Sequence, residues 1–155
     1  MREEKGVKKI LMGILLGATV LCHPILSEAH ERQCPKPIEV TQEEAQELMN
    51  IAWCEAGNQG PDGQLYVMSV IINRVNSPEW PDNIHDVIYE PHQFATKGMS
   101  KAQPTEETHL ALAYLEMGNL VPEIIAFEKV NNNALDQYFS EAFEYRAHQF
   151  YTLSN

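Results

Sequence analysis

The chain has 155 residues, about the size of one small domain once any targeting segment has been removed. It contains 22 Asp and Glu against 11 Lys and Arg, which gives a formal net charge of -11 at pH 7. A nucleic-acid-binding surface needs a basic patch that neutralises phosphates, so we expect no nucleic acid as a partner. This acidity also argues against electrostatic capture by anionic polymers, whereas an uncharged ligand in a cleft remains compatible.

The first 29 residues have the three parts of a secretory signal peptide. Residues 1–9 contain four basic side chains, residues 10–26 form an apolar run, and the small residues Ser27 and Ala29 precede a cleavage site. Export with cleavage before His30 would leave 7 basic and 19 acidic residues, a net charge of -12. The apolar run is short and interrupted for a membrane span, so we expect no stable span after cleavage; the alternative is an uncleaved anchor.

Residues 30–40 form a polar linker with two prolines, and residues 41–155 are expected to form the catalytic domain. Cys34 in the linker and Cys54 in the domain both remain after signal cleavage. In an oxidising compartment they would form a disulfide that ties the linker to the domain; the alternative is two unpaired thiols. The cysteines lack the CxxC spacing of metal sites, so we expect neither a structural zinc nor another cofactor.

The first predicted helix spans residues 41–56. Thr41 is a favourable N-cap residue, and Glu44, three residues later, completes a capping box. Gly57 suits the C-cap position, and the glycines and proline that follow it predict a tight loop. One face of this helix has the spacing of a buried stripe that ends at a carboxylate: Leu48, Ile51, Ala52 and Glu55.

Glu55 therefore combines an apolar helix face with the C-terminal end of the helix. Partial burial and the negative end of the helix dipole both disfavour its ionised form, which suits a general acid that works near neutral pH. The alternative is a structural glutamate that pairs with an arginine or a backbone group at the edge of the core. The spacing alone leaves both interpretations open.

The next two predicted helices span residues 63–76 and 83–89. The first of them has a buried stripe made of Leu65, Met68, Ile71 or Ile72, and Val75. Asp82 or Asn83 caps the second, shorter helix, because both side chains accept hydrogen bonds from the first helical turn.

A loop is predicted over residues 91–101 and a fourth helix over residues 105–117. The stripe of this helix consists of His109, Leu112, Ala113 and Glu116. Leu110 and Leu115 lie off the stripe, which indicates burial on more than one side.

Two strands are predicted after the last helix, over residues 124–130 and 143–152. They would pair as an antiparallel hairpin with a long, partly helical connection over residues 134–139. Helices followed by a small antiparallel sheet define an α+β fold class, with mainly helical content.

Several short motifs follow one another in a fixed order between residues 46 and 151. They are Glu55-Ala56, the turn Gly60-Pro61-Asp62-Gly63-Gln64, Asn73-Arg74-Val75, Trp80-Pro81, Val87-Ile88-Tyr89, Gln93-Phe94 and finally His148-Gln149-Phe150-Tyr151. No single motif is specific, but the ordered set resembles the SleB/CwlJ-type cell-wall hydrolases, the spore-cortex-lytic enzymes of germination and their vegetative relatives. The resemblance implies a lysozyme-like or lytic-transglycosylase-like arrangement of the α+β domain.

The resemblance also implies an activity, namely cleavage of the β-1,4 bond between N-acetylmuramic acid and N-acetylglucosamine in exported form. Glu55 falls at the family's catalytic position, and a lytic transglycosylase needs this one Glu as both acid and base. A hydrolytic muramidase or glucosaminidase would need a second acid, for which Glu128, Asp86 and Glu116 are unranked candidates. The third alternative is a catalytically silent wall-binding module. Spore cortex, vegetative wall and a phage host's wall all remain open as the source of the glycan strands.

The resemblance suggests substrate-binding roles for five further residues. They are Gln93, as a hydrogen-bond partner of a sugar acetamide, Phe94, at the floor of the cleft, His148, Tyr151 and Asn73. Core packing is the alternative for Phe94 and for His148, and Arg74 beside Asn73 is equally compatible with pairing a carboxylate. His148 and Tyr151 are three positions apart, so a regular strand puts them on opposite faces unless a bulge intervenes.

Two segments depart from the family pattern. Gly57-Asn58 stands where many members carry Arg or another polar residue, and residues 127–131 replace an aromatic segment that usually precedes the final motif. The second segment would line the glycan cleft, so it bears on the preference for particular sugars. No peptidoglycan-binding repeat precedes the domain, so wall targeting would need an accessory protein or simple diffusion.

Overall fold

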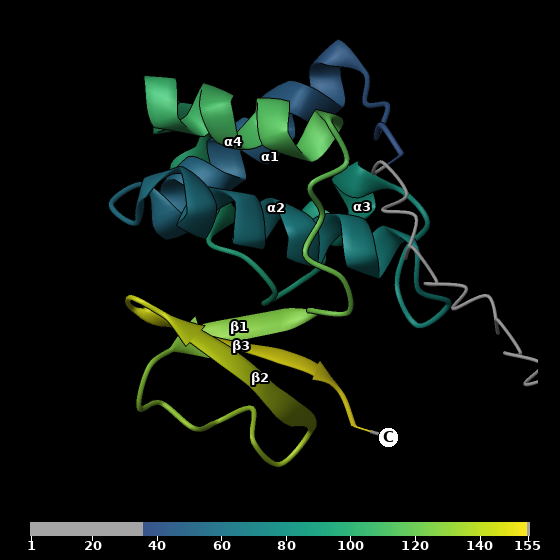
Figure 1. Ribbon diagram of the computed structural model, residues 1–155, viewed down its shortest axis with the longest axis vertical. Helices are drawn as coiled ribbons and strands as arrows, with labels where there is room; N and C mark the ends of the chain where they lie inside the picture. The colour runs from purple at the N-terminus through teal and green to yellow at the C-terminus, as the bar shows by residue number, and fades with distance from the viewer. Residues whose placement is uncertain (1–35, 155) are drawn as a thin grey trace, which may run out of the picture. The chain divides into compact units, whose positions relative to one another are not determined.

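The computed structural model describes residues 36–154, in which helices lie on one side of a three-stranded antiparallel sheet (Figure 1). The elements in chain order are α1 (Gln42–Ala56), α2 (Gly60–Val75), α3 (Ile84–Tyr89), the 3₁₀ helix η1 (Thr96–Lys101), α4 (Glu106–Glu116), β1 (Ala126–Lys129), β2 (Phe139–Tyr145) and β3 (His148–Leu153). This arrangement confirms the predicted α+β class.

The predicted signal peptide, most of the predicted linker and Cys34 lie outside the described residues. Export and the Cys34–Cys54 disulfide therefore stay predictions. Within residues 36–154, no helix has both the length and the apolar character that a membrane crossing requires.

The first helix, α1, begins and ends where the sequence predicts. The N–H of Glu44 donates to Oγ1 of Thr41 at 3.2 Å, and the Glu44 carboxylate accepts from the N–H of Thr41 at 2.8 Å. At the other end, the N–H of Gly57 donates to the carbonyl of Trp53 at 2.9 Å. The stripe residues that lie fully buried in the core are Leu48, Ile51 and Ala52. Together these contacts fix Glu55 at the C-terminal end of a well-anchored helix.

The second helix, α2, lies between the sheet on one side and α1 and α4 on the other, and it is buried on most sides (Figure 1). It begins three residues before its predicted start, since Pro61 fits the first turn of a helix. The left-handed residue is Gly60, with a φ of 75°, whereas Gly57 is right-handed at -58°. Besides the predicted stripe, the helix buries further residues around its circumference: Gln64, Val67, Ser69, Val70 and Arg74. On the side that faces the sheet, Val70 packs on Phe150.

The segment predicted as a loop over residues 91–101 contains the 3₁₀ helix η1, whose Met99 is buried in the main core. The preceding helix, α3, is capped by Asn83, whose Oδ1 accepts from the N–H of Asp86 at 2.8 Å. Asn83 is therefore the cap among the two predicted candidates.

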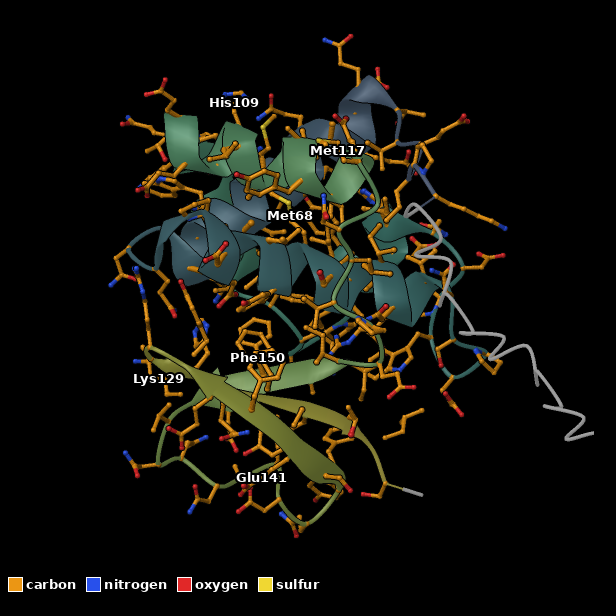
Figure 2. The ribbon with its side chains drawn as sticks, viewed as in Figure 1. Met68, His109, Met117, Lys129, Glu141 and Phe150 are labelled. Carbon is orange, nitrogen blue, oxygen red and sulfur yellow. The ribbon has the colours of Figure 1, made fainter. Side chains whose placement is uncertain are left out.

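The fourth helix, α4, buries a different face from the predicted one. The observed buried residues are Thr108, Ala111, Leu112 and Leu115, while His109 and Glu116 are exposed. The observed face buries two leucines and no charge, whereas the predicted face would have buried Glu116 without a partner. Figure 2 shows His109 on the side of this helix that lies away from the sheet.

The sheet has three strands in the order β1-β3-β2. The predicted antiparallel pairing is confirmed as that of β1 with β3, but the prediction of only two strands is wrong. The predicted strand over residues 143–152 reverses direction at Arg146 and Ala147, and Arg146 has a φ of 52°. Such two-residue turns usually contain Asn or Gly, so the sequence offers no turn signal here. The connection over residues 134–139 is also not helical.

The two faces of the sheet pack against different partners. On the helix-facing side, three phenylalanines pack against the Tyr66 ring or against each other: Phe127, Phe143 and Phe150. Figure 2 shows Phe150 between the sheet and α2. On the outward side, Tyr151 packs with Leu135 and Phe139. The pairing of β2 with β3 shifts by one residue between Glu141 and Phe143, which makes a β-bulge at Ala142.

Candidate active site

Glu55 lines a pocket of about 560 Å³, which we call the Glu55 pocket. Its lining residues come from the end of α1, the turn into α2, and the ends of β1 and β3: Trp53, Cys54, Glu55, Gly57, Asn58, Gln59, Lys129, Ala147 and His148. The N–H of Ala95 donates to Oε1 of Glu55 at 2.7 Å and so orients the half-buried carboxylate. Within residues 36–154 the one salt bridge shorter than 4.0 Å joins His85 and Glu47, so no Arg or Lys pairs with Glu55 there.

His148 lines the same pocket from the start of β3 and is only 6% exposed. Nε2 of Gln59 lies 3.0 Å from Nδ1 of His148, and Gln59 is itself 3% exposed. Burial, together with the positive charge of Lys129, lowers the pKa of His148. His148 is therefore neutral at neutral pH and offers the pocket a hydrogen-bonding group without a charge.

Lys129 brings a positive charge to this pocket, at the end of β1 (Figure 2). It is the partner of His148 in the β1–β3 ladder, so both side chains lie on the helix-facing side of the sheet. Lys129 belongs to the segment over residues 127–131 that was expected to line the cleft, whereas Gln59 was not among the predicted site residues. The alternation of side chains along a strand places Lys129 on the same face as Phe127, and this was the available sequence signal for Lys129. The sequence contains no signal for Gln59 beyond its position in the Gly-rich turn.

A second pocket, of about 610 Å³, opens along the free edge of β1 and is called here the Trp80 pocket. It is lined by Arg74, Trp80, His92, Gln93, Ala126, Phe127, Glu128, Asn132, Ala134, Leu135, Tyr138 and Phe139. Phe127 connects the two pockets, because its ring centroid lies 4.8 Å from that of His148. The structure therefore brings Gln93 to a pocket next to the one that holds Glu55 and His148.

Arg74 is a structural residue of the Trp80 pocket rather than the partner of a carboxylate. Its Nε donates to the carbonyl of Ile125 at 2.6 Å, and its Nη1 donates to Oε1 of Gln93 at 3.1 Å. The guanidinium carbon lies 4.0 Å from the centroid of the Trp80 ring, a cation–π contact. Burial lowers the pKa of Arg74 to about 10, against the opposing effect of Glu90, so the side chain stays charged at neutral pH.

Tyr151 lies on the outward face of the sheet, away from His148, as the odd spacing predicts for a strand that pairs regularly with β1. Its hydroxyl lies 2.7 Å from Oε1 of Glu128 and 2.8 Å from Oδ1 of Asp136. Burial and these two carboxylates raise the pKa of Tyr151. The structure does not bring Tyr151 to the Glu55 pocket.

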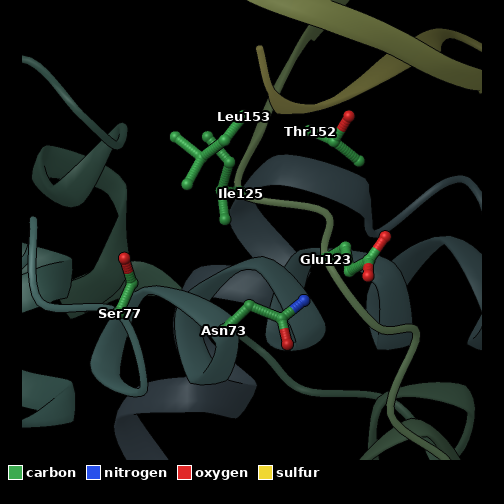
Figure 3. A pocket seen from close by; sticks show the side chains of 6 residues that line it. All are labelled: Asn73, Ser77, Glu123, Ile125, Thr152 and Leu153. Carbon is green, nitrogen blue, oxygen red and sulfur yellow. The ribbon is translucent and has the colours of Figure 1, made fainter. Parts of the chain in front are cut away.

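Asn73 is also separate from Glu55. Its Nδ2 donates to the carbonyls of Val121 and Ile124, both at 2.8 Å, which joins α2 to the chain that enters β1. It lines a third pocket of about 420 Å³ with Ser77, Glu123, Ile125, Thr152 and Leu153 (Figure 3). No lining residue of the Glu55 pocket belongs to this third pocket.

Phe94 is half-buried and packs in the core, with its ring centroid 6.1 Å from that of Phe127. The three candidates for a second acid are also accounted for. Glu128 lines the Trp80 pocket, while Asp86 and Glu116 are exposed on α3 and α4. None of these three lines the Glu55 pocket.

These features agree with the comparisons made with known proteins. A sequence model of the cell wall hydrolase family matches residues 58–151, more than half of the chain, so the chain belongs to this family. The match begins three residues after Glu55. Among curated relatives, the chain is 30% identical over 89 residues to the spore cortex-lytic enzyme of Halalkalibacterium halodurans, covering 57% of this chain and 27% of that enzyme. It is 34% identical over 67 residues to the spore cortex-lytic enzyme of Bacillus subtilis, covering 42% and 22%.

Two solved structures share the fold. The catalytic domain of the Bacillus cereus SleB protein superposes with a TM-score of 0.64 at 22% identity, covering 76% of this chain and 95% of that one. The catalytic domain of the germination-specific lytic transglycosylase SleB from Bacillus anthracis gives a TM-score of 0.63 at 23% identity, covering 75% and 99%. The chain spans roughly a quarter of the length of the curated relatives that it matches.

Proposed function

We propose that the chain cleaves the glycan strands of peptidoglycan at the β-1,4 bond between N-acetylmuramic acid and N-acetylglucosamine, as a lytic transglycosylase with Glu55 as its acid and base. The observation that carries this proposal is that Glu55 is the one carboxylate among the lining residues of its pocket. Hydrolytic glycosidases hold two carboxylates on either side of the bond, about 5 to 10 Å apart. A pocket with a single carboxylate supports the lytic transglycosylase route, because this route needs no second carboxylate to activate a water molecule.

In the first step, the carboxylic acid form of Glu55 gives its proton to the glycosidic oxygen as the bond to the anomeric carbon of the muramic sugar breaks. The acetamido oxygen of that sugar stabilises the cation that develops. In the second step, the Glu55 carboxylate accepts the proton of the C6 hydroxyl, whose oxygen bonds to the anomeric carbon and closes a 1,6-anhydro ring. Glu55 ends the cycle protonated, as it began. The Ala95 N–H supports this role by holding the carboxylate in one orientation.

The other predicted site residues divide into direct and indirect roles in this proposal. His148 contacts the sugar in the Glu55 pocket, and Gln93 donates to a sugar acetamide in the Trp80 pocket. Phe94 supports the cleft from beneath, through Phe127. Tyr151 and Asn73 act through the backbone segments and loops that they hold, because their polar atoms already bond protein groups.

The names of the relatives support the choice of substrate. Curated relatives are spore cortex-lytic enzymes, and one solved neighbour is a germination-specific lytic transglycosylase. Spore cortex peptidoglycan is therefore the first substrate to test, with vegetative peptidoglycan beside it. An acidic chain binds such a strand through its sugars rather than through charge.

Mass spectrometry of digested peptidoglycan tests the reaction directly. The proposal expects fragments that end in 1,6-anhydro-muramic acid and no such fragments from the Glu55→Gln variant. Reducing-end fragments would instead support a hydrolytic muramidase or glucosaminidase. The absence of any fragment from the intact protein would support a silent wall-binding module.

The proposal includes export through the N-terminal signal peptide, which suits a substrate outside the cytoplasmic membrane. Edman sequencing of secreted material should then give an N-terminus at or near His30. An intact Met1 recovered in the membrane fraction would support the anchor in place of the cleaved signal.

A further inference from the structure

The outer side of α4 carries large apolar side chains that no other residue covers within the described part of the chain. Leu110, Tyr114 and Met117 are 42%, 36% and 64% exposed. Only six large apolar side chains are exposed among residues 36–154, so half of them lie on this one helix or at its C-cap. Spacings of four and three residues place all three on one face, opposite the face that packs in the core. This surface is called here the outer α4 face.

The apolar row on the outer α4 face is contiguous and is held in place. Single exposed apolar side chains are common on protein surfaces, whereas a contiguous patch of them marks an interaction site. At the start of the helix, the N–H of Thr105 donates to Oγ1 of Thr108 at 3.0 Å. At its end, the N–H of Gly118 donates to the carbonyl of Leu115 at 2.8 Å. A partner therefore meets a helix that is already formed and does not have to order it.

The charged side chains of α4 are all negative. The helix contains Glu106, Glu107 and Glu116 and neither Lys nor Arg. Glu106 and Glu107 also stabilise the N-terminus of the helix through its dipole, but Glu116 lies at the C-terminal end, where its charge opposes the dipole. Glu116 is exposed and forms no salt bridge within residues 36–154. Helix stability therefore does not explain Glu116, whereas a basic group of a partner would.

These glutamates distinguish between the molecules that could cover the outer α4 face. Two copies of the chain that meet through this face would bring their glutamates together, at the cost of like-charge repulsion. A helix that lies on a lipid surface carries Lys or Arg on its polar side, and α4 has neither. A partner helix with apolar residues at helical spacing, and with Lys or Arg beside them, complements both the apolar row and the negative charge.

We propose that the outer α4 face is the docking surface for a basic amphipathic helix of a partner protein. The apolar side of that helix covers Leu110, Tyr114 and Met117, and its Lys or Arg residues pair with Glu106 and Glu116. None of these five residues lines the Glu55 pocket or the Trp80 pocket, so docking leaves both pockets open. Such docking corresponds to an accessory protein, rather than simple diffusion, as the route of the chain to the wall. It does not depend on the reaction proposed at Glu55.

Met117 reports directly on this face, because it is the one exposed methionine among residues 36–154, where Met49, Met68 and Met99 are buried. The full chain, labelled with ¹³C at its methionine methyl groups, is titrated with a synthetic helical peptide that has leucines at i, i+3, i+4 and i+7 and lysines elsewhere. The NMR signal of Met117 is assigned with Met117→Leu. The proposal expects this signal to shift along a saturating binding curve, while the signals of the buried methionines stay in place.

Matched variants separate the outer α4 face from other exposed apolar side chains. Leu110→Gln should weaken peptide binding about tenfold, and glutamine has nearly the helix propensity of leucine. Leu153→Gln changes a leucine of β3 that is 44% exposed, and it should leave the binding unchanged. Glu116→Gln should weaken the binding roughly threefold, and this loss should disappear at high salt. Circular dichroism checks that the variants are folded.

The proposal is overturned if the peptide binds while the Met117 signal stays still, or if Leu110→Gln and Leu153→Gln bind it equally well. Equal binding of a peptide with the same residues in shuffled order, or of one with glutamates in place of the lysines, would also overturn it. A Met117 signal that moves with protein concentration alone would assign the face to a second copy of the chain. One that moves with phosphatidylcholine vesicles would assign it to a lipid surface, and either result overturns the basic helix. Failure of the proposed function looks different, because peptidoglycan would stay uncut while the peptide titration is unchanged.

Discussion

The helix-facing and outward-facing sides of the sheet share the same three strands but use their polar residues differently. His148 and Lys129 face the helices and line a pocket, where few protein groups satisfy them. Glu128 precedes Lys129 by one residue and Tyr151 follows His148 by three residues, so both face outward. Their side chains form hydrogen bonds with each other and with the loop over residues 132–136. Successive side chains of a strand point to opposite faces of the sheet. In this sheet the alternation separates residues that are available to a ligand from residues that stabilise the fold.

The largest effect is expected at Glu55, at the pocket on the helix-facing side. Glu55→Gln should lower glycan cleavage by about 10²- to 10⁴-fold, because glutamine neither gives nor takes a proton. Its side-chain oxygen still accepts from the Ala95 N–H, so the melting temperature should stay within a few degrees of the wild type. Turbidity loss of purified sacculi and circular dichroism measure the two properties.

Glu116→Gln, on the exposed end of α4, is the matched control and should keep full activity. Near-normal cleavage by Glu55→Gln would remove Glu55 from the mechanism. A clear fall in its melting temperature would show that Glu55 is chiefly a structural carboxylate.

The next largest effect is expected at His148, on the helix-facing side of β3. His148→Gln should lower kcat/KM about ten- to hundredfold, because a neutral imidazole that lines the pocket is replaced by a group of different shape and reach. Initial rates on soluble glycan fragments, at several substrate concentrations, separate KM from kcat. A variant with unchanged kcat/KM would show that His148 belongs to the core alone.

A stability effect of similar or smaller size is expected at Tyr151, on the outward side of the same strand. Tyr151→Phe removes the hydroxyl shared by Glu128 and Asp136 and should cost about 1 to 2 kcal/mol of unfolding free energy. Urea denaturation measures this cost, and kcat/KM of the folded variant should stay within about twofold of the wild type. A loss of activity as large as that of His148→Gln would contradict the division between the two faces.

The smallest expected effect is a pH dependence of stability at His148. Burial and Lys129 lower its pKa in the folded state, so the unfolded chain binds a proton there first as the pH falls. The stability from neutral His148 is complete above its unfolded pKa of about 6.5 and declines as the pH falls below that value. Urea denaturation between pH 7.5 and 5 should show a steeper decline for the wild type than for His148→Gln; parallel curves would contradict this.

Much of the helical layer could be predicted from the sequence, because its signals are local. The capping box at Thr41 and Glu44 and the stripe that leads to Glu55 need only a few neighbouring residues to act. The buried face of α4 was misassigned, because Leu115, which lies off the predicted stripe, is buried, whereas Leu110 is 42% exposed. Only the packing of the whole domain decides which of the two leucines is buried.

The sheet was harder to predict for a different reason. Arg146 adopts a left-handed conformation without a glycine or asparagine to announce it, so residues 143–152 resemble one continuous strand. Tertiary packing overrides the local preference at this turn. With the turn missed, the third strand and the bulge at Ala142 were missed as well.

The candidate site was predicted in part for the same reasons. Glu55 and His148 belong to motifs and were identified, and the structure brings both to one pocket. Lys129 reaches the pocket through the register of β1 with β3, and Gln59 reaches it from the turn between α1 and α2, where its amide contacts His148. No spacing within a single segment encodes that meeting.

The bulge in β2 bears on how the chain behaves when many copies gather on an insoluble substrate. β2 is an outer strand of the sheet, and an open strand edge invites pairing with a strand of another molecule. The extra residue Ala142 interrupts the regular spacing of the backbone groups, and the exposed carboxylates of Glu141 and Glu144 repel an identical edge. These two features disfavour pairing through β2 between copies of this chain that crowd at a surface.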